Sequence, residues 1–247
     1  VLGDDVEVLA CDVRGPEGLD DAVAGASVVV SAVHGFLGGR GAGPRDVDER
    51  GNAHLVDAAA RAGASVVLVS VVGAAPESPL ELCRAKYAAE QHLRAAATPW
   101  TIVRAGPFLQ TWLTVLTQTA GKSGRPMIFG RGEQPLPFVC ATDVAELVAR
   151  AATDASLRQQ ILELTGSPMT MTELAQALQR ARGWHGSVRR VPRPVLRTFG
   201  ALARPVNPAF ARKNRAALAM DTTPLAARGD ADRLLGRAPR GVDDALR

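Results

Sequence analysis

The fold is set by the stretch VDERGNAHLVDAAARAGASVVLVSVVGA (residues 47–74), in which a helical pattern is followed by a strand pattern. Within residues 46–62, apolar side chains recur every three or four positions, as they do on the buried face of an amphipathic helix. Residues 65–72 are almost all β-branched or aliphatic, which is typical of a strand buried on both faces. This succession predicts one unit of a parallel α/β sheet.

The same alternation extends from this stretch in both directions. Further β-branched strands are predicted at residues 6–13, 27–33, 101–104 and 161–165. Amphipathic helices are predicted at residues 19–24, 82–96 and 143–153. The chain is therefore predicted to be an α/β protein with a doubly wound, Rossmann-like parallel sheet.

A helix with clear boundaries follows the last predicted strand. Thr170 and Glu173 form a T-x-x-E capping box that opens this helix, and Gly183 is placed to end it. A short extended stretch is predicted next, at residues 187–191.

The rest of the chain is rich in proline and arginine. Pro194, Pro205 and Pro208 are expected to break it into short helices, because proline disrupts a helix interior. We predict a Rossmann-like core over residues 1–168 and a helical region on the substrate side over residues 169–247.

Length and composition indicate an ordinary globular protein. The 247 residues are 47% hydrophobic and 22% charged, which suits one domain with a modest elaboration. The three cysteines are widely spaced and odd in number, which favours reduced thiols and a cytoplasmic location. The longest apolar runs have the length of strands, so no membrane segment is predicted.

Charge is divided unevenly along the chain. Residues 1–179 hold 14 basic and 20 acidic side chains (net −6), whereas residues 180–247 hold 15 and 5 (net +10). A basic C-terminal third can attract an acidic substrate, an acidic partner or nucleic acid. It equally fits a solvated helical face that offsets an acidic core. On that interpretation we expect a small-molecule substrate and no nucleic-acid partner.

Four segments together resemble the NmrA-like, atypical branch of the short-chain dehydrogenase/reductases. They are VEVLACDVRGPEGLDDAVAGASVVVSAV (6–33), residues 47–74, LCRAKYAAEQHLRAAATPWTIVRAGPFLQ (82–110) and FVCATDVAELVARA (138–151). Their order matches the family from its third strand onward, over roughly residues 1–180. The resemblance implies an NAD(P)-binding Rossmann fold and carries several site residues with it.

Two groups of residues match the family where it binds the cofactor at strand ends. Asp12 and Val13 match the position that holds the adenine ring, although Asp12 could equally cap the helix predicted at residues 17–24. At the carboxyl end of the next strand, where ligands bind in open α/β sheets, lie Ser31, Ala32, Val33 and His34.

Lys86 matches the lysine that holds the nicotinamide ribose in the family, and Ser70 matches the hydroxyl that polarises a substrate carbonyl. In the full enzymes a tyrosine four residues before the lysine donates the proton, and Leu82 stands there. Tyr87 points about 100° away around the helix and does not replace it. Related atypical members commonly lack the tyrosine. The alternatives are that Ser70 is a turn residue and that Lys86 is a surface cation paired with Glu90.

Gly106, Pro107 and Phe108 match the loop whose backbone approaches the nicotinamide. The alternative is plain loop packing. Arg104, at the end of the preceding strand, resembles a family arginine that is usually structural.

The family's glycine-rich turn, which binds the pyrophosphate after the first strand, has no counterpart before residue 6. Gly35, Gly38 and Gly41 reproduce its spacing but follow the wrong strand. We therefore expect a chain truncated at its N-terminus, with impaired dinucleotide binding. The strand predicted at residues 6–13 then either docks beside the one at 27–33 or remains an exposed edge that favours a homodimer.

These features lead to one functional expectation and two alternatives. The resemblance implies an NAD(P)-dependent oxidoreductase, with NADP favoured over NAD, that acts on a small carbonyl or quinone-like substrate. Leu82 in the tyrosine position favours a protein that senses a dinucleotide without turning it over. The missing turn favours a scaffold or assembly module that binds no nucleotide.

Overall fold

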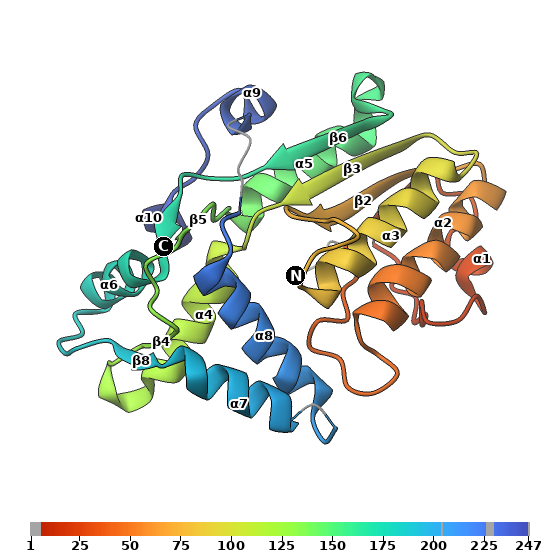
Figure 1. Cartoon of the computed structure of the whole chain (residues 1–247). Helices are drawn as coiled ribbons and strands as arrows, with labels where there is room; N and C mark the ends of the chain where they lie inside the picture. The colour runs from red at the N-terminus through yellow and green to blue at the C-terminus, as the bar shows by residue number, and fades with distance from the viewer. Residues whose placement is uncertain (1–5, 204, 226–229, 247) are drawn as a thin grey trace.

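A computed structural model of the chain describes residues 6–203, 205–225 and 230–246 (Figure 1). Its centre is a four-stranded parallel sheet of order β1-β2-β3-β6. The strands are β1 (Val28–Ser31), β2 (Ser65–Val71), β3 (Trp100–Ala105) and β6 (Gln160–Leu164). The strand predictions for residues 27–33, 65–72, 101–104 and 161–165 are thereby confirmed.

Helices cover both faces of this sheet (Figure 1). One face carries α1 (Leu19–Ala22), α2 (Asn52–Arg61) and α3 (Glu81–Ala95), and the other carries α5 (Ala141–Thr153) and α9 (Ala231–Leu235). Side chains of β2 point alternately to the two faces of the sheet, so Leu68 packs on the first face and Val67 on the second. Leu68 is fully buried, which contributes roughly 2 kcal/mol. The predicted doubly wound architecture is confirmed.

The helix predicted at residues 46–62 begins with a π-helical stretch, η1 (Arg45–Gly51), which continues directly into α2. Such winding is rare and frequently occurs at functional sites. Here η1 holds the side chain of Asp48 completely buried against α3.

The prediction of a strand at residues 6–13 is wrong. No strand is assigned there, and among the described residues β1 pairs with β2 alone. Val8 is 75% exposed and Val30, on β1, is 44% exposed. A β-branched sequence forms a strand only where a neighbouring backbone supplies hydrogen bonds, and this segment does not lie beside β1. The segment therefore does not dock as a strand beside β1. A homodimer through an exposed edge stays a prediction.

A second layer packs beside the carboxyl ends of the strands (Figure 1). Its helices are α4 (Leu109–Ala120), η2 (Gly121–Ser123), α6 (Met171–Arg182), α7 (Arg193–Ala203), α8 (Pro208–Thr222) and α10 (Val242–Ala245). Two small sheets join it, the parallel pair β4 (Met127–Phe129) with β8 (Arg189–Val191) and the antiparallel pair β5 (Pro135–Leu136) with β7 (Met169–Thr170). The short η3 (Ala155–Leu157) lies between α5 and β6.

Several boundaries in this layer follow the sequence. The Thr170–Glu173 capping box opens α6, and Gly183 ends it in the left-handed conformation at φ 61°. Pro208 starts α8, whereas Pro194 lies in the first turn of α7 and does not break it. A proline there needs no backbone donor, so the predicted break at Pro194 is wrong. The domain boundary at residue 168 stays a prediction.

Asp143 anchors the C-terminal end of the chain to the first turn of α5. Its carboxylate accepts bonds from the Arg237 guanidinium at 2.7 Å, from the Arg240 backbone N–H at 2.7 Å and from the Arg240 guanidinium. Burial raises the pKa of Asp143, but these donors outweigh it and hold the pKa below its ordinary value. No helix in the described part of the chain is both long and apolar enough to traverse a bilayer.

Candidate functional site

The carboxyl end of β1 is held by a group of polar side chains and backbone groups that we call the Lys86 cluster. Its members are Ser31, Val33, Gly35, Asp48, Asn52 and Lys86. Ser31, Val33 and Gly35 are alternate residues of the strand and the chain that leaves it. Ser31 bonds to α2, Val33 to α3 and Gly35 to η1, so the helices on one face of the sheet fix the end of β1.

Lys86 is the cation of this cluster and is only 3% exposed. Its Nζ donates to the Val33 carbonyl at 2.9 Å and forms an ion pair with Asp48 Oδ1 at 3.2 Å. Burial lowers the pKa of Lys86, while Asp48 and Glu90 oppose that shift. An ammonium has three donors, so one N–H remains after these two contacts. The alternative of a surface lysine paired with Glu90 is wrong.

Asp48 and Asn52 were not predicted from the sequence. The second carboxylate oxygen of Asp48 accepts the Gly35 N–H at 2.7 Å. Asn52 accepts the Ser31 hydroxyl at 2.5 Å and donates to the Asp48 carbonyl at 2.8 Å. A usable signal was present, because both polar residues share the helical spacing of the buried Val56.

A second buried group lies one turn further along α3, and we call it the Glu90 cluster: Ser70, Glu90, Arg104 and Glu163. Glu90 is fully buried and accepts two bonds from Arg104, at 2.9 Å and 2.6 Å. Arg104 also contacts Glu163 at 3.2 Å. The sheet register places Ser70 beside Arg104 and Arg104 beside Glu163, so the cluster crosses three strands. The structural interpretation of Arg104 agrees with these contacts.

Ser70 is 1% exposed and donates its hydroxyl to Glu90 Oε1 at 2.5 Å. The hydroxyl is therefore directed at a carboxylate inside the protein. Its predicted role toward a substrate carbonyl stays a prediction.

Residues 106–108 form a tight junction with residues 137–139. The Gly106 N–H donates to the Leu164 carbonyl at 3.0 Å, and the Pro107 carbonyl accepts the Val139 N–H at 2.9 Å. A Cβ on Gly106 would lie 2.2 Å from the Pro137 carbonyl oxygen, so this position requires glycine. These contacts are compatible with the loop-packing alternative for Pro107 and Phe108, and contact of Gly106, Pro107 and Phe108 with a nicotinamide stays a prediction.

Asp12 is exposed and pairs with Arg14 rather than with a helix. The Arg14 guanidinium at 2.5 Å and the Arg14 backbone N–H lower the pKa of Asp12 to about 2. Helix α1 begins after Gly18 without a side-chain cap, so the predicted capping role of Asp12 is wrong. Val13 packs against Gly51, where a Cβ would lie 2.8 Å from the valine methyl group. Adenine binding by Asp12 and Val13 stays a prediction.

The structure places the remaining predicted residues at the same edge. Ala32 and His34 are exposed and Val33 is half-buried, immediately after β1. Arg14 donates to the Gly41 carbonyl at 3.2 Å, so the Asp12 segment meets the loop that follows His34. Lys86 is thus joined directly to Val33, while Asp12 reaches this region through Arg14.

The glycine-rich loop at residues 35–43 uses four of its backbone N–H groups for bonds within the protein. The N–H groups of Gly35 and Gly43 donate to Asp48 and Asp46, and those of Gly38 and Ala42 donate to loop carbonyls. A phosphate-binding turn needs such groups free to point at the ligand. Four bonded N–H groups agree with the interpretation that these glycines only reproduce the spacing of the family's turn, which stays a prediction.

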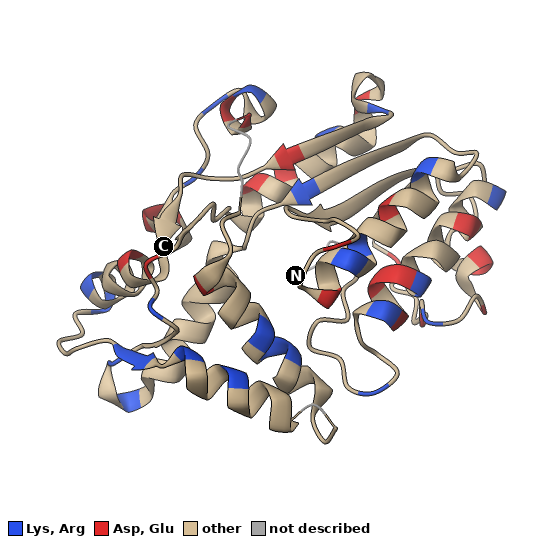
Figure 2. Ribbon diagram, viewed as in Figure 1, with Lys and Arg blue, Asp and Glu red and all other residues tan. Residues whose placement is uncertain are grey.

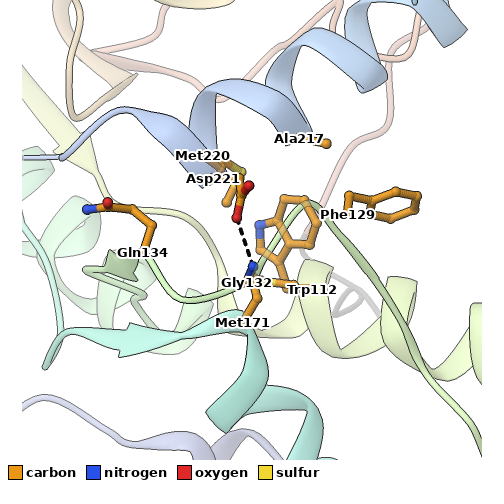
Figure 3. Close-up of a pocket in the computed structure, with 8 residues that line it drawn as sticks. All are labelled: Trp112, Phe129, Gly132, Gln134, Met171, Ala217, Met220 and Asp221. Carbon is orange, nitrogen blue, oxygen red and sulfur yellow. Dashed lines mark hydrogen bonds between the residues drawn. The ribbon is translucent and has the colours of Figure 1, made fainter. Parts of the chain in front are cut away.

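A separate small pocket lies in the second layer (Figure 3), lined by Trp112, Phe129, Gly132, Gln134, Met171, Ala217, Met220 and Asp221. Asp221 accepts the Gly132 N–H at 2.8 Å, the Arg131 N–H at 3.0 Å and the Arg193 guanidinium at 2.6 Å. Burial raises the pKa of Asp221, yet these donors keep it below its ordinary value. Its carboxylate is fully engaged, so it joins α8 to the loop after β4.

Among the described residues, no group of His, Cys, Asp and Glu side chains has the arrangement of a metal site. The geometry instead offers a buried ammonium at the carboxyl end of a parallel strand. Such a group can hold hydroxyl or carbonyl oxygens of a ligand.

Comparison with known proteins assigns the family. The model of the NmrA-like family matches residues 3–217. The chain belongs to the NmrA-like family. An NAD(P)H azoreductase of Xenophilus azovorans is 30% identical over 183 residues, which cover 72% of this chain and 59% of the azoreductase. The match thus spans about three fifths of that relative.

Solved structures agree on the fold of this NmrA-like protein. An NADPH-dependent quinone oxidoreductase of Escherichia coli superposes with a TM-score of 0.75 at 19% identity, covering 96% of this chain and 81% of its own. The triphenylmethane reductase of a Citrobacter species gives 0.72 at 21% identity, covering 96% and 81%. These likenesses support the Rossmann-like fold.

Proposed function

We propose that this NmrA-like protein is an NAD(P)-dependent oxidoreductase in which Lys86 holds the nicotinamide ribose. The observation that carries the proposal is the Lys86 ammonium, 3% exposed and bound 2.9 Å from the Val33 carbonyl. A buried lysine is costly unless it is paired or used. Its place at the carboxyl end of β1 is where open α/β sheets bind their ligands.

The names of similar proteins support the same reaction class. The azoreductase is named for NAD(P)H, and the Escherichia coli oxidoreductase and the Citrobacter reductase were solved with NADPH and NADP(H). We infer an electron-accepting small molecule of quinone or azo type as substrate, with NADP preferred.

The described residues fit part of the cofactor. Lys86 retains one N–H for a ribose hydroxyl, and the exposed residues Ala32 and His34 lie at the same strand end. For the pyrophosphate, four N–H groups of the glycine-rich loop at residues 35–43 are already bonded within the protein. The fit therefore covers the nicotinamide ribose, and we expect weak dinucleotide binding by this chain.

The roles of the side chains follow from their contacts. The bound nicotinamide supplies the hydride. Lys86 would orient the ribose, Asp48 holds the ammonium in place and opposes the lowering of its pKa by burial, and Asn52 and Ser31 fix η1 against β1. Leu82 occupies the position of the family's proton donor, so the proton that completes the reduction would come from solvent.

A second candidate is a protein that binds the dinucleotide as a signal without turnover. The half-buried Leu82 favours it, because a leucine at this position cannot donate the proton that completes a reduction. A scaffold that binds no nucleotide is the third.

Titration with NADPH and with NADH, followed by nicotinamide fluorescence, separates the three functions. Addition of menadione with absorbance at 340 nm then measures turnover. Binding with consumption of NADPH supports the oxidoreductase, binding without consumption supports the sensor, and no binding at millimolar nucleotide contradicts both.

A further inference from the structure

A polar cleft of about 650 Å³ opens where the first turns of η1, α3 and α8 meet. Its lining residues are Arg45, Glu49, Glu81, Arg84, Ala85, Pro208, Arg212 and Arg215. In Figure 2, basic positions of α8 lie across from charged positions at the start of α3. Arg212, which lines the cleft, donates to carbonyls of the loop that follows Val33, and the Val33 carbonyl accepts a bond from Lys86.

The charges that line the cleft are predominantly positive. Four arginines and two glutamates leave a formal excess of two positive charges. The long helices α3 and α8 both begin here, and the N-terminal end of a helix adds further positive potential. An anion in this cleft therefore meets a favourable field.

Arg212 is the strongest feature of the cleft, because it is a buried cation with only neutral partners. It is 7% exposed, and its guanidinium donates to the Phe36 carbonyl at 3.2 Å and to the Gly38 carbonyl. No carboxylate of a described residue forms an ion pair with it. Backbone carbonyls stabilise such a charge without neutralising it, so the site retains affinity for an anion.

The other arginines are also not neutralised. Within the described part of the chain, Arg45 and Arg215 form neither an ion pair nor a side-chain hydrogen bond. Arg84 donates to the Ser78 carbonyl at 2.6 Å, which is again a neutral partner. Several guanidiniums around one cleft are well suited to bidentate binding of a planar or tetrahedral anionic group.

We propose that this cleft binds the anionic group of an organic substrate, a carboxylate or a sulfonate, and so selects anionic electron acceptors. The proposal rests on the proposed function for the reaction, but binding to the cleft does not require the nicotinamide. Arg212 fixes the site, while Arg45 and Arg215 close on the ligand from η1 and α8.

The test is isothermal titration calorimetry at low salt without nucleotide, with anthraquinone-2-sulfonate and its neutral analogue 2-(hydroxymethyl)anthraquinone. We expect the sulfonate to bind at least about tenfold more tightly than the neutral compound, since one charge-assisted contact supplies that difference. The double variant Arg45→Gln/Arg215→Gln should lose that advantage. Both residues are exposed, so the fold is retained, as circular dichroism will verify.

The matched control is Arg180→Gln/Arg182→Gln, which removes the same charge from the exposed surface of α6. It should leave the affinity unchanged. Equal affinity for the two anthraquinones, or an equal loss in the control, would overturn the proposal. Displacement of the sulfonate by an equal concentration of 2′,5′-ADP would assign the arginines to the cofactor's phosphates and would also overturn it. Failure of NADPH binding leaves this outcome unaffected and bears on the proposed function alone.

Discussion

Lys86 and Glu90 lie one turn apart on α3 and are both buried ions, yet their surroundings differ in kind. Glu90 receives two bonds from Arg104 and one from Ser70. Lys86 has one carbonyl and one carboxylate for three donors. The Glu90 carboxylate is satisfied by the protein, whereas Lys86 has one N–H beyond its two protein contacts. The same helix thus carries one ion that the protein satisfies and one ion to which the proposed function assigns the ribose.

We expect the largest loss of stability when the charge of Glu90 is removed. Glu90→Gln leaves the Arg104 guanidinium half-buried with Glu163 as its remaining carboxylate, so we expect a loss of about 3 kcal/mol in the free energy of unfolding. Urea denaturation measures it. Glu163→Gln is the control and should cost about 1 kcal/mol, because Arg104 keeps Glu90. Equal losses would remove the distinction between the central carboxylate and the peripheral one.

Lys86→Met should cost nearly as much, about 3 kcal/mol, since it leaves the Asp48 carboxylate buried with a backbone N–H. The double variant Lys86→Met/Asp48→Asn removes both charges and should recover most of that stability. Lys122→Met makes the same replacement at an exposed site and should be neutral. A double variant as unstable as the single one would show that the pair itself, rather than an orphaned charge, determines stability.

The smallest effect concerns Ser70. Ser70→Ala removes one buried hydrogen bond, and we expect about 1 kcal/mol less stability with turnover of menadione unchanged. Combined denaturation and steady-state kinetics decide this. A fall in kcat at unchanged stability would instead restore the catalytic role that the resemblance implies for this hydroxyl.

Local patterns were sufficient to predict most of the sheet. The β-branched runs at residues 27–33 and 65–72 became β1 and β2 because each has a parallel neighbour. Residues 6–13 carry the same composition but do not form a strand. Strand formation depends on a partner backbone, which the composition of a segment does not encode.

The residues of the candidate site were likewise only partly predictable from the sequence. Lys86 could be identified through the resemblance, but its partner Asp48 lies 38 residues away in the chain and meets it through an unexpected π-helical turn. Arg212 contacts residues 174 and 176 positions earlier, and no periodic pattern marks it as buried. Long-range contacts of polar groups therefore remained hidden, although the fold that creates them was predictable.

The central claim is that the spare donor of Lys86 binds the nicotinamide ribose, and NADPH affinity tests it most directly. Fluorescence titration should give at least about tenfold weaker binding for Lys86→Met/Asp48→Asn than for the unaltered chain, at a temperature where both are folded. Lys122→Met should bind as the unaltered chain does. Equal NADPH affinity in all three proteins would contradict the claim.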